Sequence, residues 1–272
     1  MNREFTLAIY KELLTSAIEA GYTLTSYEDY IVNGNNYNKV FILRHDVDDL
    51  PENSYQTALI ERELRAKGSY FFRVVKQSMH PDVIEKIKKL GHEIAYHYED
   101  MALCNGDIDK AYQHFKTKLE IFRQYYPVQT ICMHGSPLSK WDNRLLWKKY
   151  TYKELGIIGE PYFDIDFKKV LYITDTGRMW NNETSSVRDK VESGYNFKFN
   201  STYDIIDAFK QNKLPSQIML NIHPQRWTDN YFLWMKEYVM QNIKNSVKKL
   251  LVKKQSVCVR DCSEKLFGNP KT

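Results

Sequence analysis

A ten-residue segment that begins apolar and ends acidic constrains the fold of this chain more than any other feature. The segment is Val40-Phe41-Ile42-Leu43-Arg44-His45-Asp46-Val47-Asp48-Asp49. Its continuous apolar run suits a strand that is buried on both faces of a parallel sheet. Because side chains alternate along a strand, Asp46 and Asp48 point to one face and Val47 points to the other.

Two carboxylates side by side at the end of a strand repel each other. A divalent cation relieves that repulsion, because zinc and hard cations both accept carboxylate oxygens. The two groups could also divide their roles, with one carboxylate on a metal ion and the other free as a base. The structural alternative is a solvated acidic turn leading into Pro51. The motif alone leaves both explanations equally open, since short motifs produce false matches.

Strand-like and helix-like segments alternate about seven times along the chain. Strands are expected within 40–49 and at 70–75, 92–97, 130–133, 169–174 and 217–222, with a short strand and loop within 156–166. Helices are expected at 6–20, 51–68, 81–90, 107–122, 141–154, 201–211 and 229–251. This alternation predicts an α/β fold with a parallel sheet, open or closed into a barrel. No repeat or linker divides the sequence, so residues 1–272 are expected to form one domain.

Composition excludes several classes of protein. An apolar fraction of 43% supports a sizeable core, and no apolar run reaches the roughly 18 residues of a transmembrane helix. The N-terminus lacks a signal-peptide pattern, which predicts a cytoplasmic protein. The cysteines show no Cys-x-x-Cys spacing, so neither a zinc cluster nor a disulfide framework is expected. The net charge of +5 fits an anionic substrate or partner and does not require nucleic acid.

Metal-capable and acid–base side chains follow five of the expected strands, at the point where each strand ends. They are Asp46 and Asp48, His97 and Glu99, His134, Asp175, and His223. In barrels and open α/β sheets the carboxyl ends of the strands converge on one site. Each residue also has a structural explanation, such as a turn or a buried histidine bonded to backbone. The coincidence at five strand ends favours a functional site.

The order of these motifs resembles the polysaccharide deacetylase superfamily, the NodB-homology fold, over about residues 40–227. The segment 90–97, Leu-Gly-His-Glu-Ile-Ala-Tyr-His, is similar to the family's Gly-His-Glu-Ile-Gly-x-His motif and is the most specific match. Segment 44–49 is similar to the first motif, a pair of aspartates. Segment 175–180 is similar to a motif with an aspartate and a nearby tryptophan, and 220–223 to the last motif, which ends in the catalytic histidine. The resemblance implies a distorted (β/α) barrel of about seven parallel strands.

The sequence departs from the family's pattern at two places. Met101 stands where the family usually supplies a second metal-binding histidine, four residues after the first. In place of a motif that normally holds arginine and prolines, the chain has His134-Gly135-Ser136-Pro137. The chain therefore resembles a divergent branch, and similar chains are associated with the biosynthesis of bacterial surface polysaccharides.

The resemblance implies metal-assisted hydrolysis of an N-acetyl group on an amino sugar. A divalent metal ion polarises the amide carbonyl and lowers the pKa of its bound water to about 7. The ligands would be Asp48 and His97, with His134 or Glu99 as the third. Zinc is the first expectation for such mixed nitrogen and oxygen ligands, which also suit manganese, iron, cobalt or nickel.

The resemblance also assigns the proton transfers. Asp46 would be the general base that takes the proton of water, and His223 the general acid that protonates the departing amine. Asp175 would hold His223 in the required tautomer and raise its pKa.

Three further residues are expected to bind the substrate. Arg178 would pair with a carboxylate in the site. Trp180 and Trp227 would form a wall on which a sugar stacks, unless they belong to the core, where tryptophans are more common.

The expected C-terminal helix and the residues after it are rich in lysine. The lysines are Lys236, Lys244, Lys248, Lys249, Lys253 and Lys254. A solvated helix face is the simpler explanation, and peripheral association with an anionic membrane or a lipid-linked intermediate is the alternative. A cytoplasmic location would favour a nucleotide-activated or lipid-linked sugar over a finished polymer.

Three other functions fit part of the pattern. An aspartate-nucleophile phosphatase would use Asp46, but a further acidic motif of that class is missing and the histidines would have no role. A glycosyltransferase with an Asp-x-Asp motif needs a preceding nucleotide-binding region, and only about 40 residues precede this one. A catalytically inactive, sugar-binding pseudoenzyme is the third, because the usual second histidine is lost. Metal content separates the pseudoenzyme from the hydrolase.

Overall fold

Seven strands form one sheet in the computed structural model, which describes residues 3–180, 188 and 191–247. The strands are β1 (Thr23–Thr25), β2 (Val40–Val47), β3 (Ser69–Phe72), β4 (Glu93–Tyr98), β5 (Ile131–Met133), β6 (Leu171–Thr174) and β7 (Gln217–Ile222). Their order is β5-β4-β3-β2-β7-β6, and β1 pairs with β2 as well. All the pairings are parallel. The predicted α/β fold with about seven parallel strands is confirmed.

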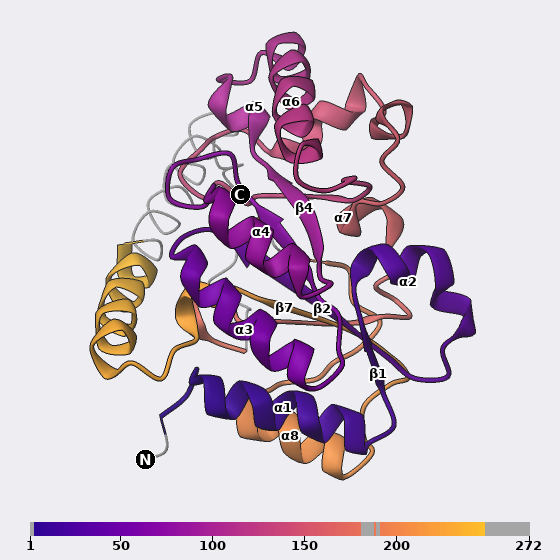
Figure 1. Cartoon of the computed structure of the whole chain (residues 1–272), viewed down its shortest axis with the longest axis vertical. Coiled ribbons are helices and arrows are strands. Elements are labelled where there is room, and N and C mark those ends of the chain that lie inside the picture. The colour runs from indigo at the N-terminus through magenta and orange to yellow at the C-terminus, as the bar shows by residue number, and fades with distance from the viewer. Residues whose placement is uncertain (1–2, 181–187, 189–190, 248–272) are drawn as a thin grey trace, which may run out of the picture.

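Helices fill most of the connections between strands and cover the sheet (Figure 1). The α-helices are α1 (Leu7–Glu19), α2 (Tyr27–Asn33), α3 (Pro51–Glu63), α4 (Pro81–Lys89), α5 (Asp100–Leu103), α6 (Ile108–Arg123), α7 (Pro161–Asp164) and α8 (Thr202–Lys210). The 3-10 helices are η1 (Gly34–Asn36), η2 (Asn143–Lys148), η3 (Tyr152–Leu155), η4 (Thr176–Arg178) and η5 (Pro224–Arg226). Residues 231–247 are also helical.

The central strand β2 is buried along its whole length, as its apolar run predicts. Phe41 and Leu43 point to a core that is shared with α1 and α8. Val40 and Ile42 point the other way, into a smaller core with residues of β3, β4, β5 and β7. Alternation places Arg44 and Asp46 on this second face, so apolar and polar layers succeed each other inside the sheet.

The sheet curls strongly. β5 lies three strands from β2, which in a flat sheet would be about 14 Å. Side chains stand roughly perpendicular to a sheet, yet Nε2 of His134, directly after β5, lies only 3.7 Å from Oδ1 of Asp48, directly after β2. His223, from the other side of β2, also lies within 3.8 Å of Asp48. The strands therefore form a curled half-barrel, in agreement with the expected distorted barrel.

Several element boundaries differ from the sequence prediction. The helix expected at 141–154 is two 3-10 helices, because the side chains of Asp142 and Thr151 each accept a backbone N–H and start a new turn. The segment 156–166 supplies only an isolated bridge, at Gly159, and the short helix α7. That residues 1–272 form a single domain stays a prediction. No helix among the described residues has the length and apolarity needed to cross a bilayer.

A tightly packed buried cluster behind β2 gives a test of the fold. Nε2 of His45 lies 2.7 Å from Oε1 of Glu61, and both side chains are buried. A Cβ on Gly68 would lie 2.5 Å from Oε2 of Glu61 and 2.8 Å from Cε1 of His45. We expect Gly68→Ala to lower the free energy of unfolding by about 1–3 kcal/mol, because neither neighbour can move without breaking the pair. Urea denaturation measures this loss.

The matched control is Gly135→Ala, where an added Cβ would meet nothing within 4 Å. Its free energy of unfolding should change by less than about 0.5 kcal/mol. Equal losses in the two variants would contradict the packing around Gly68.

Candidate active site

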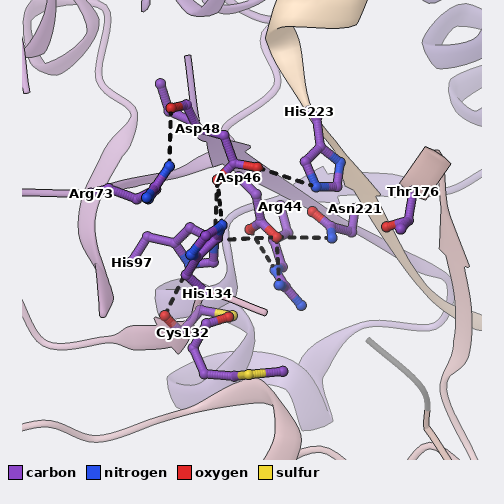
Figure 2. A network of polar contacts seen from close by, with 12 residues as sticks. Arg44, Asp46, Asp48, Arg73, His97, Cys132, His134, Thr176, Asn221 and His223 are labelled. Carbon is purple, nitrogen blue, oxygen red and sulfur yellow. Dashed lines mark hydrogen bonds and ion pairs between the residues drawn. The ribbon is translucent and has the colours of Figure 1, made fainter. Parts of the chain in front are cut away.

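Polar side chains from the carboxyl ends of several strands meet around Asp48 (Figure 2). Nε2 of His97 lies 3.6 Å from Oδ1 of Asp48 and 3.7 Å from Oδ2 of Asp46. Nε2 of His134 lies 3.7 Å from the same Oδ1 of Asp48, and Nε2 of His223 lies 3.8 Å from Oδ2. The structure thus brings together five of the residues that the sequence places at strand ends.

The carboxylate of Asp46 accepts hydrogen bonds from two neighbouring side chains, those of Arg44 and Asn221. Nε and Nη2 of Arg44 donate to its two oxygens at 2.9 and 2.7 Å, and Nδ2 of Asn221 donates to Oδ2 at 3.1 Å. Burial alone would raise the pKa of Asp46, but the Arg44 guanidinium and the nearby histidines outweigh it and hold this pKa well below its usual range. Asp46 is therefore an ionised, fixed carboxylate.

Asp48 is in a different position, because among the described residues no guanidinium forms an ion pair with its carboxylate, and Arg73 acts on it only from further away. Burial raises the pKa of Asp48, and its electrostatic interaction with His134, His223, His97 and Arg73 outweighs burial and lowers it. Within the described residues, its Oδ1 is buried without a hydrogen-bond donor. Buried carboxylate oxygens almost always have a partner. This orphaned oxygen, facing two imidazole nitrogens, is what a bound cation would satisfy.

His97 presents an unprotonated nitrogen to the two aspartates. Its Nδ1 lies 3.0 Å from the carbonyl oxygen of Cys132, and only a protonated Nδ1 can donate there. Burial disfavours the imidazolium and lowers the pKa of His97 to about 4, despite the neighbouring carboxylates. Near pH 7, His97 is therefore neutral with a lone pair on Nε2, the form in which histidine binds a metal ion.

Glu99 orients His134 instead of facing the site itself. Its oxygens accept from Nε and Nη2 of Arg73 at 2.9 Å each, and Oε2 lies 2.9 Å from Nδ1 of His134. Burial raises the pKa of Glu99, but His134 and Arg73 outweigh it and lower the pKa to about 2. With Nδ1 bonded to a carboxylate, His134 directs Nε2 to Asp48. Of the two expected third ligands, the geometry favours His134.

His223 is held by Asp175, as the motif order implies. Oδ1 of Asp175 lies 2.6 Å from Nδ1 of His223, and the carboxylate also accepts from Nε1 of Trp227 at 2.8 Å and Nη1 of Arg226 at 2.6 Å. Burial and Arg226 lower the pKa of His223, while Asp175 and Asp48 outweigh them and raise it above its ordinary value. His223 therefore favours its protonated form.

Of the three expected substrate-binding residues, Trp180 and Trp227 are buried, as in the alternative that places them in the core, and Arg178 pairs with a carboxylate outside the group around Asp48. Trp227 is completely buried, and its indole donates to Asp175. Trp180 is buried in the core against Phe5 and donates to Thr202. The Arg178 guanidinium is paired with Glu237 and stacked on aromatic rings. A sequence motif shows that these residues are close in the chain to Asp175 or His223, but not that they point into the core.

Sequence reasoning missed Arg44, Asn221 and Cys132. The alternation that pairs Asp46 with Asp48 also puts Arg44 on the same face, so a signal for Arg44 was present. Asn221 likewise stands two residues before His223 on β7. Cys132 lies inside an apolar run, and only the curl of the sheet brings it to the site.

Among the described residues, the three possible metal donors that all lie within 4.8 Å of one another belong to Asp46, His97 and Cys132. Both oxygens of Asp46 already accept from Arg44. We therefore favour Asp48, whose Oδ1 is free, as the carboxylate ligand beside His97 and His134. Met101 is buried in the core, so the position of the family's second histidine contributes nothing here.

No protein-family model and no curated protein matches the chain. Among solved structures it is similar to the Xyl-CE4 domain of a multidomain xylanase from the hindgut metagenome of Trinervitermes trinervoides, at 11% identity and a TM-score of 0.37. That similarity covers 80% of this chain and 84% of that chain. It is also similar to a mutant of peptidoglycan deacetylase PdaC from Bacillus subtilis, at 11% identity and a TM-score of 0.37 over 77% of this chain and 97% of that chain.

The buried pair of Arg44 and Asp46 gives a test of the site's electrostatics. Arg44→Met leaves a buried carboxylate without its counter-charge, and we expect the free energy of unfolding to fall by about 3–5 kcal/mol. Adding Asp46→Leu removes the stranded charge and should recover most of that loss. Denaturant unfolding of both variants measures the difference. A double variant as unstable as the single one would show that charge pairing is not what stabilises this part of β2.

Proposed function

We propose that this chain is a metal-dependent hydrolase of the polysaccharide deacetylase superfamily that removes an N-acetyl group from an amino sugar. One observation carries the proposal. Oδ1 of Asp48, which has no hydrogen-bond donor among the described residues, lies between Nε2 of His97 and Nε2 of His134. Beside it are Asp46, whose charge is balanced by Arg44, and the protonated His223, whose charge is balanced by Asp175. A metal site flanked by a base and an acid is what amide hydrolysis requires.

The carboxylate of Asp48 lies close enough to each of the two histidines to share a divalent ion with it. Two ligands at the usual 2.0–2.2 Å from one ion lie roughly 3–3.5 Å apart. The separations from Oδ1 of Asp48 to Nε2 of His97 and of His134 are 3.6 and 3.7 Å. Asp48, His97 and His134 would hold the ion, with zinc the first expectation and manganese, iron, cobalt or nickel the alternatives. When bound, the ion polarises the amide carbonyl and lowers the pKa of water enough for a weak base to accept its proton.

The remaining residues supply proton transfer. Asp46, kept ionised by Arg44, takes one proton from the attacking water as the new C–O bond forms. His223 gives the proton on Nε2 to the amide nitrogen as the C–N bond breaks, so that acetate and the free amino sugar leave. Asp175 accepts from Nδ1 of His223 throughout and keeps the acidic proton on Nε2. The phosphatase alternative leaves His97, His134 and His223, which meet around Asp48, without a role.

The substrate in this proposal is an N-acetylated sugar on a nucleotide or lipid carrier, used in the cytoplasm for the synthesis of a surface polysaccharide. The net charge of +5 supports an anionic carrier, since a positively charged protein attracts phosphate groups. Comparing turnover of a free N-acetyl sugar with that of its diphosphate-linked form tests this choice, and equal turnover would count against it.

Metal content separates the hydrolase from a sugar-binding pseudoenzyme. Protein purified without chelator should hold about one divalent ion per chain, and Asp48→Asn, His97→Ala and His134→Ala should each lose it, as elemental analysis would show. Asp46→Asn should keep the ion and lose about 10²- to 10⁴-fold in acetate release. Asp49→Asn, at an exposed position beside the site, is the control and should change neither quantity. A wild type that binds no zinc, manganese or cobalt would favour the pseudoenzyme.

The assignment of His223 predicts how activity depends on pH. Activity should fall as the pH rises through the raised pKa of His223, because the acid must carry its proton. Asp175→Asn removes a negative charge, which lowers that pKa, so the alkaline limb of kcat/KM should move to lower pH by about one unit or more. An unmoved limb in a folded Asp175→Asn protein would exclude His223 as the acid.

A further inference from the structure

The helix at 231–247 is fixed against the body of the protein by its inner face. Nε1 of Trp234 donates to the carbonyl oxygen of Glu4 at 2.6 Å, and Glu237 pairs with Arg178. One turn on, Gln241 is buried. These contacts recur at helical spacing, so they set the rotation of the helix and decide which residues face outward.

The opposite, outer face of this helix is apolar and exposed. It consists of Phe232, Val239, Met240, Ile243 and Val247, which follow helical spacing. Phe232 is 82% exposed and Ile243 is 53% exposed. In the part of the chain that the structure describes, no other helix exposes so many large apolar side chains. Contiguous apolar surface of this kind marks a site of interaction.

The charges on and around the outer face are positive. Lys236 and Lys244 are exposed beside the apolar residues, while Glu237, the one acidic residue among 231–247, is on the inner face and paired with Arg178. The sequence goes on as Lys248-Lys249-Leu250-Leu251-Val252-Lys253-Lys254, which lies outside the described residues. An apolar stripe with Lys236 inside it and Lys244 at its border is complementary to an anionic lipid surface, where the lysine ammonium groups reach the headgroups.

A second copy of the chain is a poorer occupant. Symmetric pairing of two outer faces would bring Lys236 and Lys244 of both copies together, and this face carries no carboxylate to compensate them. Paired helices usually combine lysine with glutamate at such flanking positions. The charge pattern therefore favours lipid over a second copy.

The helix is attached at the edge of the candidate active site. Nδ2 of Asn245 donates to the carbonyl oxygen of Gly177 at 2.9 Å, two residues after Asp175, which holds His223. On the inner face, Oε1 of Glu237 also lies 3.8 Å from Nε of Arg226, which bonds to the same Asp175. Figure 1 shows this helix along one side of the molecule, across the sheet from α2.

We infer that the outer face of the helix at 231–247 docks on an anionic membrane surface and so brings the carboxyl edge of the sheet to a lipid-linked N-acetyl sugar. The choice of sugar substrate rests on the proposed function, but docking itself needs only the helix.

Sedimentation of the full chain with vesicles tests the inference. The wild type should bind vesicles of phosphatidylcholine mixed with phosphatidylglycerol at least about tenfold more tightly than vesicles of phosphatidylcholine alone. Val239→Asp with Ile243→Asp should weaken binding to the anionic vesicles by about tenfold or more, because both aspartates enter the apolar stripe. Lys236→Glu with Lys244→Glu should remove the preference for anionic lipid. Val32→Asp, an exposed apolar position on α2, is the matched control and should bind like the wild type.

Two results would overturn the inference: wild-type protein that binds neither vesicle, or a Val32→Asp variant that loses binding as much as the variant on the outer face. A third such result would come from light scattering without lipid. If the wild type is a dimer and the variant with Val239→Asp and Ile243→Asp is a monomer, the outer face binds a second copy of the chain. Release of acetate from a water-soluble N-acetyl sugar is measured separately. A wild type that releases acetate but does not bind vesicles would contradict only this inference. A wild type that binds anionic vesicles but releases no acetate would contradict only the proposed function.

Discussion

The site depends on a buried ion pair inside the central strand. A carboxylate in the interior of a sheet is strongly disfavoured unless a counter-charge reaches it. Arg44 meets that requirement from two residues earlier on β2, with both hydrogen bonds to Asp46. With Asp46 neutralised in this way, Asp48 on the same face is left with an Oδ1 that has no hydrogen-bond donor in the described part of the chain. One strand thus presents two aspartates with different chemistry.

The three histidines differ for a similar reason. His97 is buried with Nδ1 on a backbone carbonyl and stays neutral. His134 has Nδ1 on Glu99, whose own charge is shared with Arg73. His223 has Nδ1 on Asp175 and favours its protonated form. In each case the partner of Nδ1 fixes the ring and directs Nε2 to Asp48, and the neutral His97 suits metal binding while the raised pKa of His223 suits proton donation.

Sequence patterns predicted the sheet and the convergence of strand ends, because period-two alternation and apolar runs are local. The role of Arg44 could have been derived from the same alternation. The ion pair between Arg73 and Glu99 could not be derived in this way, because it depends on where the ends of β3 and β4 lie relative to each other. For Trp180, Trp227 and Arg178 the sequence left the direction of the side chain open, because closeness in sequence to Asp175 and His223 does not determine it. The two 3-10 helices after β5 follow from local caps that compete with a longer helix.

Anomalous diffraction from zinc-soaked crystals tests the central claim most directly, because it locates the ion instead of only counting it. We predict one peak within bonding distance of Asp48, His97 and His134, with Asp46 still bonded to Arg44. A peak among Asp46, His97 and Cys132 would show that these three residues bind the metal ion, and Asp46 could then not be the proposed base. The absence of any peak in this region would contradict the metal-dependent mechanism altogether.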